Sequence, residues 1–212
     1  MEYNLNIIDI GTNYGLDIKN YSKKSNIYCF EPNPALYTHL KNTFSDYKNL
    51  NVYNFAVADY TGEADFYLTK DTYSSSLLNV NEKYRFKDVL KQTDKIKTKV
   101  INLKEFIEQN KIKQVDFYKS DAQGMDFKIL KSIGDLIKII KVGRIEVVNK
   151  NNQIYKDQDN YLEDIVEYLK SYEFECINEY EIKELFNNEN IIDYDLKFIQ
   201  RGKNILWKKI NL

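Results

Sequence analysis

Residues 4–15, with the sequence NLNIIDIGTNYG, decide the fold because an apolar run passes directly into a turn with two glycines. Residues 4–10 read as a buried strand, and the glycines end it. Later apolar runs alternate with stretches of helical spacing, which is typical of βαβ units. The sequence therefore predicts an α/β fold in which helices cover both faces of a mostly parallel, twisted sheet.

The expected elements continue outward from this first strand. Strands are predicted over residues 26–31, 51–57, 64–68, 98–103, 115–119, 142–148, 174–177, 196–199 and 204–208. Helices are predicted over residues 34–47, 105–110, 125–133 and 161–172. Glycine turns at residues 61–62 and 201–203 are expected to pair the strands that flank them, the second as an antiparallel C-terminal hairpin.

Residues 70–98 make a longer connection than two neighbouring strands need. They contain the sequence YSSSLL at residues 73–78 and a charged stretch for which we expect some helix. Loops of this length in compact domains are usually lids or binding loops. We expect a single domain over residues 1–212, with residues 70–98 as a lid or insert.

The composition is that of an ordinary globular protein. The 212 residues are 43% hydrophobic, and the net charge of −1 gives no overall attraction to nucleic acid or anionic lipid. No apolar run reaches the roughly 18 residues of a membrane span, and the N-terminus lacks the features of a signal peptide. We therefore expect a cytoplasmic protein without a membrane partner. Cys29 and Cys176 have neither disulfide nor metal-ligand spacing and are expected to be buried thiols.

The turn after the first strand lies where open α/β sheets bind their ligands. It is not a dinucleotide fingerprint, because Asn13 stands where that pattern needs glycine. The Asp9 carboxylate would repel phosphates but suits a ligand with an amino group and a sulfonium, and S-adenosylmethionine is such a ligand. Gly11 and Gly15 would let the backbone approach it closely.

Glu31 ends the second predicted strand, at the spacing after Gly11 expected of an acidic residue that binds ribose hydroxyls. A carboxylate suits this role because it accepts two charge-assisted hydrogen bonds at once. The alternative is a solvated glutamate beside a merely tight turn. Taken together, Asp9, the glycines and Glu31 favour a nucleoside-binding site.

Residues 115–131, VDFYKSDAQGMDFKILK, carry a longer pattern. They match V-D-x-x-K-x-D-x-[EQ]-G-x-[ED]-x-x-x-L-K, and the sequence here resembles the FkbM family of S-adenosylmethionine-dependent methyltransferases. The stretches that also agree in order and spacing are residues 9–15, 30–34, 56–59, 75–77 and 145–147. The resemblance covers about residues 7–148.

The resemblance implies a Rossmann-like class I methyltransferase fold and methyl transfer to an oxygen, often on a sugar or natural product. The residues it implies for S-adenosylmethionine are Asp9, Gly11, Thr12, Asn13, Gly15, Glu31, Pro32, Ala58 and Asp59. Ser75, Ser76 and Gln123 are expected on the substrate side. Lys104 stands where the family usually has Asp, and Gln123 replaces the commoner Glu, which weakens any scheme that needs two carboxylates around Gly124.

A sulfonium is already an activated electrophile, so the protein must mainly align the acceptor oxygen and exclude water. By analogy, Asp121 is the best candidate for a base or an orienting acceptor, and its alternative role is to cap the following helix. Lys119 and Glu146 are further catalytic candidates or, equally, a structural ion pair. His39 falls inside a predicted helix, away from the ligand edge, and is expected to be structural.

The acceptor is expected to be a hydroxyl of a sugar, glycan or small molecule. One alternative is an RNA ribose methyltransferase, with basic residues 83–99 as the nucleic-acid surface. Another is an inactive nucleoside-binding module, which Lys104 and Gln123 keep open. A nicotinamide-dependent oxidoreductase is the weakest option because of Asp9 and Asn13. No metal site is expected from ligand spacing, although Asp121 with a nearby carboxylate could hold Mg²⁺.

Overall fold

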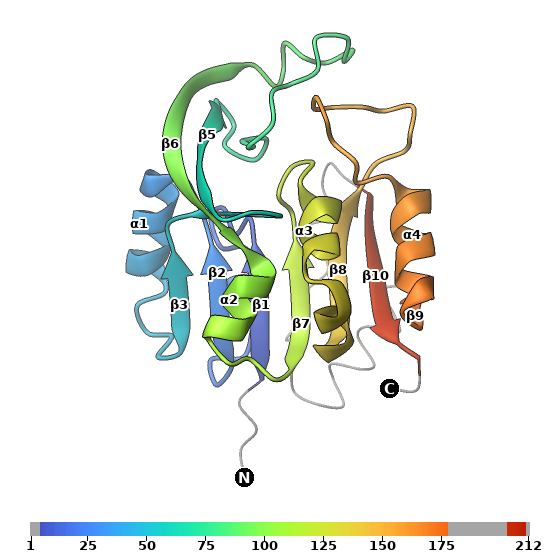
Figure 1. Cartoon of the computed structure of the whole chain (residues 1–212). Coiled ribbons are helices and arrows are strands. Elements are labelled where there is room, and N and C mark those ends of the chain that lie inside the picture. Colours follow the sequence, from blue (N-terminus) through green and yellow to red (C-terminus); the bar gives the residue numbers. More distant parts are fainter. Residues whose placement is uncertain (1–4, 178–202, 211–212) are drawn as a thin grey trace.

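The structure, a computed structural model, describes residues 5–177 and 203–210 (Figure 1). Its main sheet has seven strands in the order β3-β2-β1-β7-β8-β10-β9. These are β1 (Asn6–Ile10), β2 (Asn26–Phe30), β3 (Leu50–Tyr53), β7 (Val115–Ser120), β8 (Ile140–Val147), β9 (Phe174–Ile177) and β10 (Lys203–Lys209). β10 runs antiparallel to β8 and β9, whereas the other pairs are parallel. The predicted mostly parallel sheet is confirmed, and the predicted strand over 196–199 lies outside the described residues.

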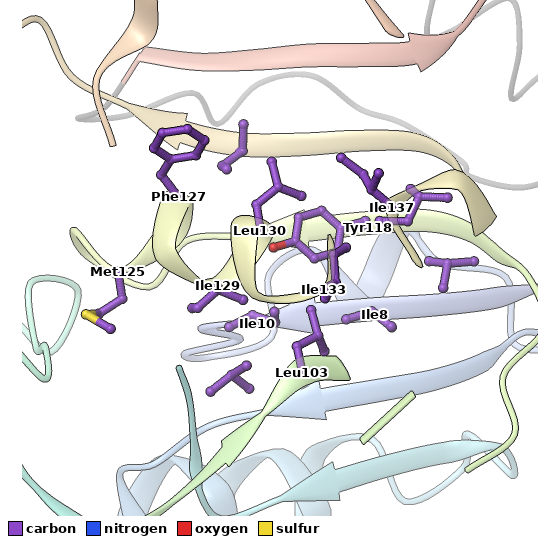
Figure 2. Packing of buried hydrophobic residues seen from close by; sticks show 14 of the residues in the cluster. Ile8, Ile10, Leu103, Tyr118, Met125, Phe127, Ile129, Leu130, Ile133 and Ile137 are labelled. Atoms are coloured by element: carbon purple, nitrogen blue, oxygen red, sulfur yellow. The ribbon is translucent and has the colours of Figure 1, made fainter. Parts of the chain in front are cut away.

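Helices cover both faces of this sheet, as predicted. The elements are α1 (Pro34–Thr43) and the 3₁₀ turn η1 (Ile18–Asn20) on one face, and α2 (Leu103–Gln109), α3 (Asp126–Ser132), the 3₁₀ turn η2 (Gly134–Ile139) and α4 (Leu162–Ser171) on the other. Successive strand residues point to opposite faces, so Ile7 joins the core under α1 while Ile8 and Ile10 join the core under α3. Figure 2 shows this second core, which includes Leu130 of α3 and Ile133, the residue that follows the helix.

A second, three-stranded sheet stands above the carboxyl ends of β1, β2 and β7 (Figure 1). It consists of β4 (Ala56–Ala58), β5 (Gly62–Thr69) and β6 (Gln92–Asn102) in the order β4-β6-β5. The predicted strand over 51–57 is therefore two strands, because the Asn54 amide donates to the carbonyls of Glu31 and Pro32 and turns the chain off the main sheet. The predicted pairing across the turn at 61–62 was wrong, since β4 and β5 both pair with β6.

The connection from β5 to β6 contains turns and single bridges, so the helix expected in its charged part was wrong. The side chains of Phe86 and Val89 are 52% and 64% exposed, so no described element packs over the apolar residues that a helix in this segment would need to bury. A short helix without such packing is marginal in water. The segment instead forms two isolated β-bridges, Ser76 with Tyr67 and Val80 with Tyr155, besides its hydrogen bonds to other loops.

Two smaller expectations concern the end of a helix and the cysteines. The helix predicted to reach Tyr47 ends at Thr43, where Phe44 leaves the helical conformation and buries its ring. Cys29 is buried as expected, but Cys176 is exposed, because it lies on β9 at the end of the strand order. No helix among the described residues is long and apolar enough to cross a membrane.

Candidate active site

A cleft lies between the carboxyl ends of the parallel strands and the small sheet. The space between its walls, with the open solvent at its mouth included, is about 610 Å³. Its walls are formed by Ile10, Gly11, Asn13, Phe30, Glu31, Pro32, Phe55, Ala56, Val57, Phe66, Thr72, Tyr73, Ser75, Leu77, Asp121, Ala122, Gln123 and Met125. Since β1 lies between β2 and β7, Glu31 and Asp121 occupy opposite sides of Gly11, with apolar and aromatic walls between them.

Glu31 is 4% exposed and follows β2 directly. Its two carboxylate oxygens accept the backbone N–H groups of Asn13 and Asn33, both at 2.8 Å. Burial raises the pKa of Glu31 to about 7, although the two N–H donors act in the opposite direction. Each oxygen keeps an acceptor site for a further donor, so Glu31 can receive two ligand hydroxyls.

Asn13 connects three parts of the cleft. Its backbone, at φ 52°, lies in the left-handed region that asparagine tolerates. Its N–H binds Glu31, and its side-chain Nδ2 donates to the carbonyl of Thr72 at 3.2 Å. The residue that excludes a dinucleotide fingerprint therefore joins the glycine turn to the loop over residues 70–77.

Asp9 and Lys119 do not line the cleft, contrary to their predicted roles. Asp9 is fully buried, and its carboxylate is held by Lys119 Nζ at 3.0 Å and by the hydroxyls of Tyr21 and Thr12. Lys119 Nζ also donates to the carbonyl of Gly11 at 2.7 Å. The negative charge expected to face a ligand is thus neutralised beneath the turn.

The charge on Lys119 is firmly maintained in this network. Burial lowers the pKa of Lys119, but Asp9, Asp121 and Asp17 outweigh that effect and raise it above its usual range. A fully charged, 3% exposed ammonium cannot act as a proton acceptor. The alternative of an ion pair with Glu146 was also wrong, since the partners of Lys119 are Asp9 and Asp17.

The two glycines of the turn are required, but for different reasons from those expected. Both have positive φ, 71° at Gly11 and 74° at Gly15. A Cβ on Gly11 would lie 2.0 Å from the carbonyl oxygen of Asp121, and a Cβ on Gly15 would lie 2.5 Å from the ring of Phe44. Gly15 therefore packs against the end of α1, whereas Gly11 joins the two loops that line the cleft.

The amide of Gln123 joins two carboxylates on the other side of the cleft, which Asp121 and Gln123 line but the predicted catalytic residue Glu146 does not. The Gln123 amide donates to Asp121 Oδ1 at 2.6 Å and to Glu146 Oε2 at 3.3 Å. Burial, followed by the charges of Asp121 and Asp126, raises the pKa of Glu146 well above its usual range. The amide at position 123 thus stands between two carboxylates, where a glutamate would add a third like charge.

Tyr155 completes this group from the loop after β8. Its buried hydroxyl lies 2.9 Å from both Gln123 Oε1 and the carbonyl of Ser74. The single hydroxyl proton is shared between these two acceptors. Tyr155 therefore links Gln123 to the 70–77 loop.

Asp121 does not cap the following helix, which was its alternative role, because the N-terminus of α3 has no side-chain cap; Asp126, the first residue of α3, instead holds the loop before the helix. Asp126 accepts the Ser120 hydroxyl at 2.6 Å and the backbone N–H groups of Ala122 and Gly124 at 2.8 and 3.2 Å. Burial, then the charge of Asp121, raises the pKa of Asp126 to about 6. Asp121 is left to face the cleft.

The remaining predicted residues divide between the cleft and the scaffold. Pro32 and Ser75 line the cleft. The predicted residues that do not line it are Thr12, bonded to Asp9, Ser76, bonded to the Gln123 carbonyl, Ala58 at the end of β4, and Asp59, which follows β4 and is exposed. His39 is exposed and lies edge-on to Tyr14, 5.5 Å between ring centroids. Within the described residues, no group of three or more His, Cys, Asp and Glu is arranged to hold a metal.

Several functional candidates were missed from the sequence. The cleft residues not predicted include Phe55, Phe66, Thr72 and Tyr73. Tyr155, which was also not predicted, does not line the cleft but bonds to Gln123. Only the length of the 70–98 connection pointed toward Thr72 and Tyr73. No spacing rule relates Tyr155 to Gln123, because the two residues meet only through the fold.

The strand order, with an antiparallel strand inserted near one edge and a cleft at the carboxyl ends, defines an α/β protein with the class I methyltransferase architecture. The profile of the methyltransferase FkbM domain matches residues 9–176, and the chain belongs to this family. The predicted family resemblance is thereby confirmed.

Comparison with solved structures supports the fold. The crystal structure of methyltransferase FkbM from Methylobacillus flagellatus KT matches with a TM-score of 0.54 and 13% sequence identity. The match covers 98% of this chain and 44% of that chain, so this chain spans less than half the length of its structural relative. No curated protein matched the sequence.

Proposed function

We propose that the protein transfers a methyl group from S-adenosylmethionine to a hydroxyl oxygen of a sugar, glycan or small molecule. The observation that carries the proposal is the pair of carboxylates, Glu31 and Asp121, on opposite sides of Gly11 in one cleft. Membership of the methyltransferase family gives the reaction class. The cytoplasmic location remains a prediction from the sequence.

The residues present fit this cofactor. Glu31 has two free acceptor sites for the ribose hydroxyls, and Phe30, Phe55 and Val57 offer apolar surface for a base. The Gly11 backbone, which carries no side chain into the cleft, would lie along the cofactor. When bound, the cofactor supplies an electrophilic methyl group on a sulfonium.

Asp121 receives the proton of the acceptor hydroxyl or orients that hydroxyl toward the methyl group. Gln123 holds one Asp121 oxygen at 2.6 Å and leaves the other available for the acceptor. Burial and the neighbouring carboxylates raise the pKa of Glu146, which favours its neutral form. As the acceptor oxygen bonded to the methyl carbon, the carbon–sulfur bond of the cofactor would break, S-adenosylhomocysteine would leave with the electron pair of that bond, and the hydroxyl proton would pass to Asp121.

The charges near Asp121 favour an uncharged acceptor. Asp126 and Glu146 lie close enough to influence each other and Asp121 electrostatically, and an anionic acceptor would add to this repulsion. The basic stretch that kept the RNA alternative open is partly paired, since Lys95 and Lys97 both bind Asp65. These observations support a neutral hydroxyl compound over a nucleic acid.

A binding experiment tests the cofactor first. We expect S-adenosylhomocysteine to bind in isothermal titration calorimetry and NAD not to bind. Glu31→Gln should strongly weaken binding, whereas the exposed Glu63→Gln should not. Absence of binding to the unaltered protein, or equal binding of NAD, would contradict the proposal.

A transfer experiment then tests the reaction. Labelled methyl transfer from S-adenosylmethionine should appear with neutral sugars or hydroxylated small molecules and not with RNA. If the protein binds the cofactor but no panel member accepts the methyl group, the nucleoside-binding module becomes the better description. Salt-sensitive RNA binding that weakens on neutralisation of residues 83–99 would favour the RNA alternative.

A further inference from the structure

Thr72 has a buried hydroxyl with an unmet hydrogen-bonding requirement at the cleft. The residue lines the cleft together with Glu31 and Asn13. Its Oγ1 atom is shielded from solvent, and no described residue supplies it with a hydrogen-bond partner. A buried hydroxyl in this state lowers stability unless a partner arrives, which suggests that a ligand provides the partner.

The backbone at Thr72 supports a functional reading. Its φ of 59° lies in the left-handed region, which a β-branched residue rarely adopts. The conformation is held by the Asn13 side chain and the Ser75 N–H, which both donate to the Thr72 carbonyl, at 3.2 and 3.3 Å. Strained residues persist where the surroundings fix them, often in ligand-binding loops.

Thr72 and Glu31 lie on either side of Asn13. The backbone N–H of Asn13 binds Glu31, and its side chain binds Thr72, so one residue fixes both groups at the cleft. The next residue, Tyr73, lies 5.9 Å from the ring of Tyr14, measured between ring centroids. The loop over residues 70–77 therefore lies against the glycine turn, at Asn13, the residue whose backbone N–H binds Glu31.

We propose that Thr72 is a cofactor-binding residue whose hydroxyl donates to a ribose hydroxyl of S-adenosylmethionine beside Glu31. A ribose hydroxyl is both donor and acceptor, so it can donate to the Glu31 carboxylate and accept from Thr72. Thr72 lines the same cleft as Glu31, which would place both residues beside a ribose bound there. This inference rests on the proposed function, because it names a contact of the same cofactor.

The test compares Thr72→Val with Thr72→Ser. Valine removes the hydroxyl with little change of shape, and serine retains it. We expect Thr72→Val to bind S-adenosylhomocysteine roughly three- to tenfold more weakly in calorimetry, and Thr72→Ser to bind within about twofold of the unaltered protein. Without ligand, Thr72→Val should unfold at the same or a higher temperature, because an unpartnered hydroxyl is gone. The exposed Thr38→Val serves as control and should change neither quantity.

Equal affinity of Thr72→Val and the unaltered protein would overturn the inference while leaving the proposed function intact. Failure of the unaltered protein to bind would overturn both. The ribose contact is tested with 2′-deoxy and 3′-deoxy analogues of S-adenosylhomocysteine. One analogue should show a smaller loss with Thr72→Val than with the unaltered protein, since both changes remove the same hydrogen bond. Additive losses for both analogues would overturn the assignment to the ribose.

Discussion

Lys119 and Asp121 lie two residues apart at the end of β7, yet the charged groups around them are arranged in opposite ways. Lys119 is enclosed by the carboxylates of Asp9 and Asp17, so its charge is compensated within the protein. Asp121 instead shares a neutral amide with Glu146, another carboxylate. The first network holds the glycine turn, and the second leaves a carboxylate facing the cleft. Ion-paired charge serves the scaffold here, whereas Asp121, which acts on Lys119 electrostatically but has no ion-pair partner among the described residues, presents its carboxylate to the cleft.

The largest effect is expected from breaking the compensated network. Lys119→Met leaves Asp9 buried without its counter-ion, which should lower the free energy of unfolding by about 3–5 kcal/mol. Urea denaturation measures this change. The double variant Asp9→Asn with Lys119→Met should recover part of the loss, because no charge is left unpaired. A single variant as stable as the unaltered protein would show that Lys119 does not stabilise the turn.

A large effect on activity, with little effect on folding, is expected from a substitution of Asp121. Asp121→Asn keeps the shape of the side chain but removes its ability to take up a proton, and the rate of methyl transfer should fall by about 100-fold or more. Its affinity for S-adenosylhomocysteine should change little. Single-turnover kinetics and calorimetry measure the two quantities. An equally active Asp121→Asn variant would restrict the residue to orienting the acceptor or to no role.

The raised pKa of Glu31 predicts a pH-dependent affinity. Its pKa of about 7 means that the protonated form dominates below pH 7, whereas the ribose hydroxyls need the anionic form as acceptor. The dissociation constant for S-adenosylhomocysteine should therefore rise about tenfold as the pH falls from 8 to 6. Calorimetry at several pH values measures it. The Glu31→Gln variant, which cannot titrate, should show a flat profile, and an unaltered protein with the same flat profile would refute the argument.

The smallest effect is expected from a substitution that tests the role of the Gln123 amide. Gln123→Glu adds a like charge beside Asp121 and Glu146, which disfavours ionisation of the group. The acid limb of the rate profile for methyl transfer should move upward by about one pH unit. The exposed Gln153→Glu is the matched control and should leave the profile in place. An unmoved profile in Gln123→Glu would mean that the amide does not govern the charge on Asp121.

Much of the fold was predictable because its signals are local. Alternating strands and helices, the glycine turn, and the acidic residues at two strand ends are all visible within short windows. Glu31 and Asp121 both line the cleft, where the sequence placed them, because parallel strands bring their carboxyl ends to one edge of the sheet. The small sheet was not predictable, because the pairing of β4 with β6 depends on the turn that Asn54 makes toward Glu31 and Pro32.

The sequence by itself determined where most strands and helices lie along the chain, the turn with Gly11 and the residue types at the strand ends. The tertiary structure decided which charges are compensated: Asp9 by Lys119, more than a hundred positions away. It also brought Thr72 beside Asn13 and Tyr155 beside Gln123. The physical reason is that electrostatic and hydrogen-bond energies depend on distances between side chains in space. A local pattern fixes the chemical type of a side chain and the direction of its strand, but not its distant partners.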